Sequence, residues 1–179
     1  SDLGGLGNHE NIEAVLDTFT VSNPTNYQTY PFENFNVIFK SALIVPQKSD
    51  LYVSPSGSNS NSGLSFSQPL KTINHALFMS GADSLHPITI NVAPGTFSKT
   101  KTNEEFPLFV PSYVCIVGDD MKNTILDGGG ERSIIRQIFS QNITIKNLTI
   151  QNGFTREGGG IYCIKGWFNI FENLLIQNN

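Results

Sequence analysis

A repeat in the last third of the sequence constrains the fold more than any other feature. The segment Asn147-Leu148-Thr149-Ile150-Gln151-Asn152 returns as Asn173-Leu174-Leu175-Ile176-Gln177-Asn178, at an offset in numbering of 173 − 147 = 26. The same offset places Ile145 over Phe171 and Ile135 over Ile161. One unit earlier, the segment 124–128 (TILDG) aligns with the segment 149–153 (TIQNG) at an offset of 149 − 124 = 25. The last third is therefore interpreted as three units of roughly 25 residues, each with short strands.

Short strands at this period are typical of a parallel β-helix, in which the chain winds three strands per coil. A leucine-rich repeat would show its Leu-x-x-Leu-x-Leu frame, which is absent, and a propeller blade needs roughly 40 residues. Helical repeats would need a periodicity of about 3.6, which is absent from these units. We therefore expect an all-β fold, a right-handed parallel β-helix.

Stacking of coils turns each repeated core position into a column of identical or similar side chains, about 4.8 Å apart. We expect Ile125, Ile150 and Ile176 to form one aliphatic ladder in the core. Asn147 and Asn173 fall between two strands of one coil, where the chain must turn. Asparagine tolerates the left-handed conformation that such a corner requires, and stacked side-chain amides can bond to one another.

The chain divides by composition at about residue 48. We interpret residues 1–48 as an N-terminal β segment or the tail of a preceding domain, with a short helix over 11–17 and strands over 18–22 and 35–45. Residues 49–179 are expected to be the N-terminal coils of a β-helix, truncated at the C-terminus. The last coil would then be covered by the remainder of a longer chain or by another protomer, because an open strand edge invites aggregation.

One amphipathic helix is expected before the first coil. Ile73, Ala76, Leu77 and Ser80 lie at helical spacing, and Gly81 is a natural stop.

Composition and charge exclude several classes of protein. Only 15% of the residues are charged, against a typical quarter, and the polar content lies in Ser, Thr, Asn and Gly, as turn-rich β proteins require. The net charge of −4 and the absence of a basic stripe argue against nucleic-acid binding. No apolar run approaches the ~18 to 20 residues of a membrane span. Cys115 and Cys163 are expected to be small apolar thiols rather than a mutual disulfide.

The first part of the segment 49–179 resembles the opening of pectin-lyase-like β-helix domains from bacterial surface and secreted proteins, of the DUF1565 type. The resemblance rests on residues 51–57 (LYVSPSG), 62–64 (SGL), 69–73 (PLKTI), 90–97 (INVAPGTF) and 123–127 (NTILD). It implies a β-helix whose first helix caps the open end of the stack. It also implies a secreted or cell-surface location and frequent contact with polysaccharide, but no particular activity.

No cofactor is expected. Relatives often carry Asp in the loop that corresponds to residues 58–61, where this chain has Ser58-Asn59-Ser60-Asn61. A calcium ion would prefer carboxylate ligands, so the sequence supplies no clear calcium or other metal site.

No catalytic constellation is recognisable in the sequence. A polysaccharide lyase of this fold would need a base and a cation, and a hydrolase would need clustered carboxylates. Asp119 and Asp120 are interpreted as a solvated corner. Lys146 and Glu172, separated by the offset of the repeat (172 − 146 = 26), are interpreted as a surface ion pair between coils.

The remaining candidates for binding are four residues that could stack on a glycan, with filling of the core or of the coil end as the alternative role. They are Trp167, Tyr162, Phe154 and Arg156. We expect a surface module with a structural or adhesive role that binds polysaccharide. The alternative is the N-terminal portion of a polysaccharide lyase or glycoside hydrolase with its catalytic coils beyond residue 179.

Overall fold

The computed structural model describes residues 12–15, 35–39 and 46–179. The chain divides into two compact units, Ser1–Pro46 and Gln47–Asn179. In the first unit, strands β1 (Ile12–Val15) and β2 (Phe35–Phe39) pair in parallel. Strand β1 corrects the short helix expected over 11–17: its β-branched ends favour an extended chain that can pair with β2. The strand expected over 18–22, and residues 40–45 of the next one, lie outside the described residues.

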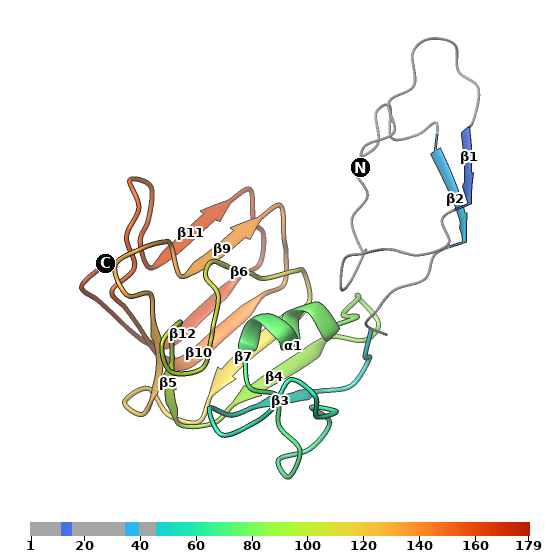
Figure 1. The fold of residues 1–179 in the computed structure, drawn as a ribbon. Coiled ribbons are helices and arrows are strands. Elements are labelled where there is room, and N and C mark those ends of the chain that lie inside the picture. The colour runs from blue at the N-terminus through green and yellow to red at the C-terminus, as the bar shows by residue number, and fades with distance from the viewer. Residues whose placement is uncertain (1–11, 16–34, 40–45) are drawn as a thin grey trace. The chain divides into compact units, whose positions relative to one another are not determined.

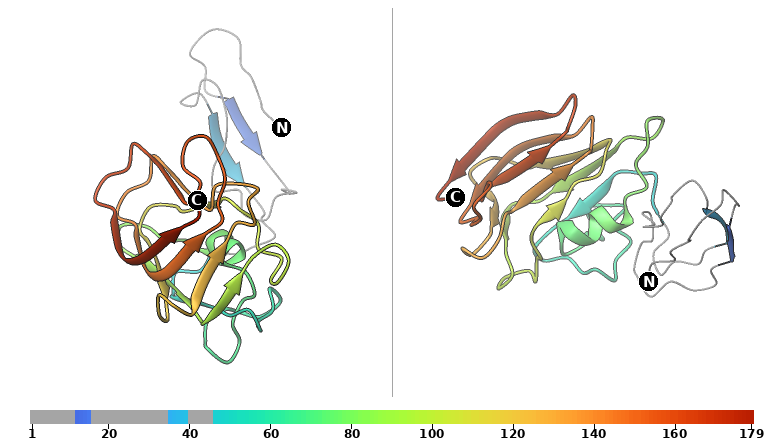
Figure 2. Two further views of the ribbon diagram at one scale, coloured as in Figure 1. Left: turned by 90° about the vertical axis from the view of Figure 1, so that its left-hand side faces the viewer. Right: turned by 90° about the horizontal axis from the view of Figure 1, so that it is seen from above.

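The second unit is a parallel β-helix with three strands per coil, as the sequence predicted (Figure 1). After β3 (Leu51–Val53), the first coil contains β4 (Ile88–Val92), β5 (Gly95–Phe97) and β6 (Leu108–Phe109). The second contains β7 (Val114–Gly118), β8 (Thr124–Asp127) and β9 (Ile135–Ile138); the third contains β10 (Thr144–Gln151) and β11 (Ile161–Ile164); and β12 (Ile170–Gln177) begins the next. Strands β10 and β12 each span a corner of the coil. Every described pairing is parallel, and the strands lie in successive rows in Figure 2.

The strand register builds three ladders of inward-facing apolar side chains. They are Leu51–Ile90–Ile116–Ile145–Phe171, Phe97–Leu126–Ile150–Ile176 and Leu108–Ile135–Ile161. The members from the first coils are fully buried in a single core. The pairs predicted from the repeat, Ile150 with Ile176 and Ile145 with Phe171, are confirmed. Because alternate side chains of a strand face opposite sides, each ladder leaves a second column that faces outward.

Ile125 does not belong to the core ladder to which the sequence assigned it. In the structure Ile125 pairs with Thr149, and the residue next to Ile150 is Leu126. The true offset between these two strands is 150 − 126 = 24, rather than 25. A slip of one residue moves a side chain to the other face of a strand, so Leu126 is buried and Ile125 is only half-buried.

Corners of the coil carry the left-handed backbone expected at Asn147 and Asn173. Their φ angles are 59° and 49°, and the Asn173 side-chain amide donates to Oδ1 of Asn147 over 3.2 Å. Other corners repeat the same conformation one coil apart, at Phe139 and Lys165, Asn142 and Phe168, and Asn152 and Asn178. The turns at 139–152 therefore stack on those at 165–178 as regularly as the strands do.

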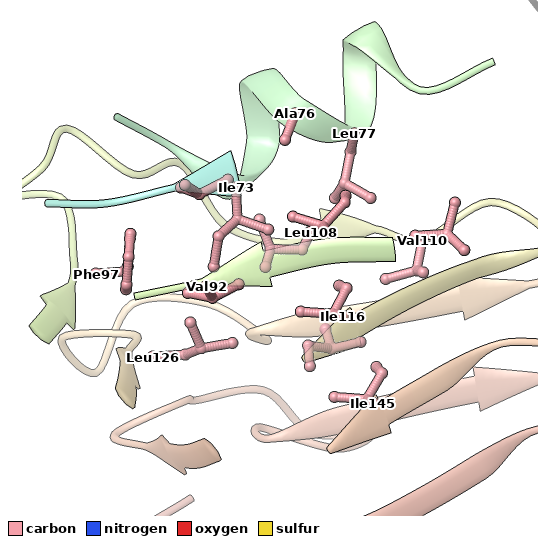
Figure 3. Close-up of a cluster of buried hydrophobic side chains, with 14 of the residues drawn as sticks. Ile73, Ala76, Leu77, Val92, Phe97, Leu108, Val110, Ile116, Leu126 and Ile145 are labelled. Atoms are coloured by element: carbon pink, nitrogen blue, oxygen red, sulfur yellow. The ribbon is translucent and has the colours of Figure 1, made fainter. Parts of the chain in front are cut away.

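Helix α1 (Ile73–Met79) covers the N-terminal end of the core, as the capping helix predicted from the sequence. Its buried residues Ile73, Ala76 and Leu77 point toward Val92 and Leu108 of the first coil (Figure 3). The helix begins after Thr72, whose hydroxyl accepts the His75 N–H at 3.2 Å, a typical N-cap bond.

Asn59 of the serine-rich loop connects that loop to the helix cap. Its side-chain oxygen accepts the N–H groups of Lys71 and Thr72 at 3.0 and 3.2 Å, and its amide donates to the Thr72 hydroxyl at 3.0 Å. Asn59 thus holds the N-terminus of the helix in place.

Candidate ligand-binding site

The sheet formed by β6, β9 and β11 carries a column of aromatic and cationic side chains on its outward face. Phe109 on β6 pairs with Arg136 on β9, and Arg136 pairs with Tyr162 on β11. The Arg136 guanidinium lies over the Tyr162 ring, 4.7 Å from its centroid. Phe109 is 58% exposed. This column follows the axis of the coils, since each member belongs to a different coil.

A hollow of about 280 Å³ opens beside the column. Side chains from the end of the β8–β9 connection, from β9, from β11 and from the loop between β10 and β11 line it: Ser133, Arg136, Thr155, Arg156, Glu157 and Tyr162. The loop is held at its base, because Ser133 is buried and its hydroxyl donates to the Gly158 carbonyl at 2.9 Å. Phe154 N–H also donates to the Arg132 carbonyl at 2.9 Å. The hollow is therefore built on two coils of regular strand and one anchored loop.

The two arginines of this hollow have no carboxylate partner. Within residues 46–179, neither Arg136 nor Arg156 forms an ion pair, although Glu157 lies on the same lining. The Nε atom of Arg136 is buried without a hydrogen-bond partner. An unpaired buried polar group costs free energy, and a charged one costs more. Arg136 therefore keeps unused hydrogen-bonding capacity at the edge of the hollow.

Of the four residues predicted to bind a glycan, the structure brings two into this hollow, Tyr162 and Arg156. Phe154 lies in the same loop and is 68% exposed, but it does not line the hollow. Trp167 lies at the next corner, 58% exposed, where it pairs with Gln141. Glycan binding by these residues stays a prediction.

Arg136 also lines the hollow, although sequence reasoning did not place it beside Tyr162. Its offset from Tyr162 is 162 − 136 = 26, the same offset that relates Ile135 to Ile161. Extending the repeat by one position would have placed an arginine next to the predicted aromatic residue. Ser133 and Thr155 carry no comparable signal in the sequence.

Two acidic residues of the coils, Asp120 and Asp127, have structural partners. Asp120 accepts the N–H groups of Lys122 and Asn123 and the Asn123 side-chain amide, which closes the corner between β7 and β8 as expected. Asp127 accepts the side-chain amides of Gln151 and Asn152 at 2.9 and 3.0 Å. Across the part of the chain that the structure describes, no group of three His, Cys, Asp or Glu residues is arranged to hold a metal ion.

Lys146 and Glu172 are neighbours in register, as the repeat predicted. The ion pair expected between them is wrong, since none forms between these two described side chains. An exposed pair gains little free energy.

The thiols of Cys115 and Cys163 are free. None of the helices described is long and apolar enough to cross a membrane.

A protein-family model described as "Protein of unknown function (DUF1565)" matches residues 55–173. The match covers about two thirds of the chain. The chain belongs to the DUF1565 family. The match confirms the resemblance seen in the first part of the segment 49–179, and in this DUF1565 chain the matched residues include the entire hollow. No curated protein and no solved structure matches the chain.

Proposed function

We propose that this DUF1565 chain is a secreted or cell-surface β-helix module that binds an acidic polysaccharide in the hollow between Arg136, Arg156 and Tyr162. One observation carries the proposal: two arginines without a carboxylate partner among the described residues line a hollow next to an aromatic ring. The role is one of adhesion or structure, with no catalytic step.

The ligand chemistry follows from the donors. A guanidinium presents parallel N–H groups that match a carboxylate or sulfate, and such charge-assisted bonds are roughly twice as strong as neutral ones. A sugar ring has an apolar face that can lie against exposed aromatic side chains such as Phe109, which is 58% exposed one coil from Arg136. A saccharide that bears an acidic group meets both requirements.

Repetition favours a polymer over a single sugar. Phe109, Arg136 and Tyr162 follow one another along the coil axis at the strand spacing of about 4.8 Å. This spacing is close to the length of one sugar unit. A chain laid along the axis would meet a new side chain at each residue, and the second exposed aromatic surface, at Trp167 on the next corner, is available to longer ligands.

Isothermal titration calorimetry with an oligogalacturonate, and with a neutral xylo-oligosaccharide of equal length, tests the proposal. We expect the acidic ligand to bind and the neutral one to bind at least tenfold more weakly. Arg136→Gln removes a charged hydrogen bond of about 1.5–3 kcal/mol, so the dissociation constant should rise roughly 10- to 100-fold. Lys122→Gln removes the same charge from the exposed corner between β7 and β8 and is the matched control.

Equal binding of both ligands, or an Arg136→Gln variant that folds and binds like the wild type, would contradict the proposal. Circular dichroism verifies folding of the variant, because Arg136 also packs on Tyr162. Antibody labelling of intact cells that express the full protein tests its location at the surface.

A further inference from the structure

Glu104 is a fully buried carboxylate with no cation paired to it among the described residues. Its side chain is 0% exposed, and it lies in the loop between β5 and β6. The loop is folded onto itself, because the N–H groups of Thr102 and Glu104 both donate to the Ser98 carbonyl, at 3.0 and 3.1 Å. Thr102 is buried as well. Glu104 is therefore held rigidly at its place in the core.

The Glu104 carboxylate binds the first turn of the capping helix, far from it in the sequence. Its two oxygens accept the N–H groups of Ile73 at 2.7 Å and Asn74 at 2.9 Å. The Asn74 side-chain amide donates to the neighbouring Glu105 carbonyl at 2.9 Å. These three hydrogen bonds attach α1 to the loop, and the buried face of α1 covers the N-terminal end of the core.

The charged groups around Glu104 do not neutralise it. Those that line the same hollow as Glu104 come from its own loop and from the turn after β8: Lys99, Glu105, Glu131 and Arg132. His75 is the titratable residue of α1. Lys99 pairs with Glu131 at 3.3 Å, and Glu105 adds a like charge. No ion pair reaches the Glu104 carboxylate within residues 46–179.

We infer that Glu104 is a proton-dependent latch on the cap: α1 docks tightly while the Glu104 carboxyl is protonated and loosens when it ionises. A protonated carboxyl keeps acceptor capacity on its oxygens, so it can still accept a hydrogen bond from the first turn of α1, and it carries no buried charge. An ionised carboxylate in the same place carries the desolvation cost of a buried charge. Opening of the cap returns that charge to water.

The direction of the effect follows from the burial of Glu104 without a paired cation among the described residues. Burial raises the pKa of Glu104 from 4.5 to about 7 and outweighs the opposing hydrogen bonds from Asn74 and Ile73. A group that binds its proton more tightly in the docked state stabilises docking fully below pH 4.5. That stabilisation is lost as the pH rises from 4.5 through 7. Above this range Glu104 is ionised in both states, and the free energy of docking no longer changes with pH.

Amide hydrogen exchange of the full chain, measured by NMR between about pH 5 and pH 8, tests the latch. Protection factors, corrected for intrinsic exchange, should fall on the order of 50-fold for the amides of Ile73, Asn74 and His75. Amides of Ile116 and Ile145 in the middle of the stack should not follow. A carbon-13 titration of the Glu104 carboxyl should show its midpoint at about 7.

Two kinds of variant isolate the group responsible. Glu104→Gln is neutral at every pH, so the protection of α1 should lose its pH dependence, although it starts lower because the Gln amide accepts only one of the two bonds. Glu105→Gln removes an exposed neighbouring charge that is the smallest of the effects on the Glu104 pKa, so the protection of α1 should keep its pH dependence with only a small downward shift of the midpoint. His75→Gln tests the titratable residue of α1 itself, whose pKa is lowered by burial. This variant should also keep the wild-type pH dependence of protection.

Three results would overturn the latch. They are a carboxyl midpoint in the ordinary range of an exposed glutamate, equal pH dependence for α1 and for the core strands, and an unchanged profile in Glu104→Gln. If Glu104→Gln fails to fold, the comparison of α1 with core amides in the wild type still decides.

Discussion

The register of the ladder Phe97–Leu126–Ile150–Ile176 predicts unequal losses of stability for substitutions at two neighbouring residues. Leu126 is 0% exposed and stacks between Phe97 and Ile150, whereas Ile125 is half-buried on the outward side. Leu126→Ala removes three buried carbons, each worth about 0.8 kcal/mol, and leaves a cavity that neighbours above and below cannot fill. We expect a loss of about 3–4 kcal/mol in the free energy of unfolding, within the range of roughly 2–5 kcal/mol for such changes.

Ile125→Ala is the matched control and should cost about 1 kcal/mol or less, because outward positions in a strand lose little on truncation. Urea unfolding, followed by circular dichroism and by the fluorescence of the single tryptophan, gives both values by linear extrapolation. Coincident transitions from the two signals establish that a single free energy is defined. Equal losses for the two variants, or a larger loss for Ile125→Ala, would refute the pairing of Leu126 with Ile150 and the ladder built on it.

Corners and thiols supply three more predictions. A Cβ at Gly118 would lie 2.1 Å from the Asn147 carbonyl oxygen, so Gly118→Ala should lower the free energy of unfolding by about 3 kcal/mol, and an unchanged midpoint in urea would contradict this packing. Asn173→Ala should cost about 1 kcal/mol because its φ is 49°, and Asn173→Gly should cost less by the same assay. Ellman's reagent should titrate two thiols in the unfolded chain, and in the folded chain Cys163, which is exposed, should react faster than Cys115; fewer than two thiols would show a disulfide.

The period and the stacking of the fold could be predicted from sequence because a β-helix makes them visible there. Each strand pairs with its equivalent one coil away, so a core position must be refilled with an apolar residue every coil, as at Ile150 and Ile176. Asn147 and Asn173 mark the same corner twice. The capping helix could also be predicted, because the helical spacing of Ile73, Ala76 and Leu77 interrupts an otherwise β pattern.

The exact neighbours in the second coil could not be predicted, because corners differ in length. Residues 119–123 separate β7 from β8, whereas Asn147 alone makes the equivalent corner of the third coil. The offset is therefore 145 − 116 = 29 before the corner and 150 − 126 = 24 after it. An average period of 25 residues misaligns these strands by one position, so the sequence analysis paired Ile150 with Ile125 instead of Leu126.

Only part of the candidate site could be predicted from the sequence, because its residues come from different coils. Tyr162 and Arg156 attract notice in the sequence as an aromatic residue and a cation near one corner, but a hollow exists only where the loop at 154–157 folds beside two coils. Arg136 comes from the preceding coil, and no local motif connects it to that loop. Glu104 carries even less signal, since nothing in its neighbourhood of the sequence points to a helix that ends well before it.

The unequal corners have a consequence for how such a chain can diversify. Positions 93 and 94 join β4 to β5, positions 119–123 join β7 to β8, and Asn147 alone suffices in β10, yet the strands on either side keep their partners. Length can change at this edge without disturbing any hydrogen-bond ladder, because each strand is positioned by the coil beneath it rather than by its own connection. Segments grafted at residues 119–123 would inherit a rigid base, and new surface chemistry could be added there while the apolar columns stay the same.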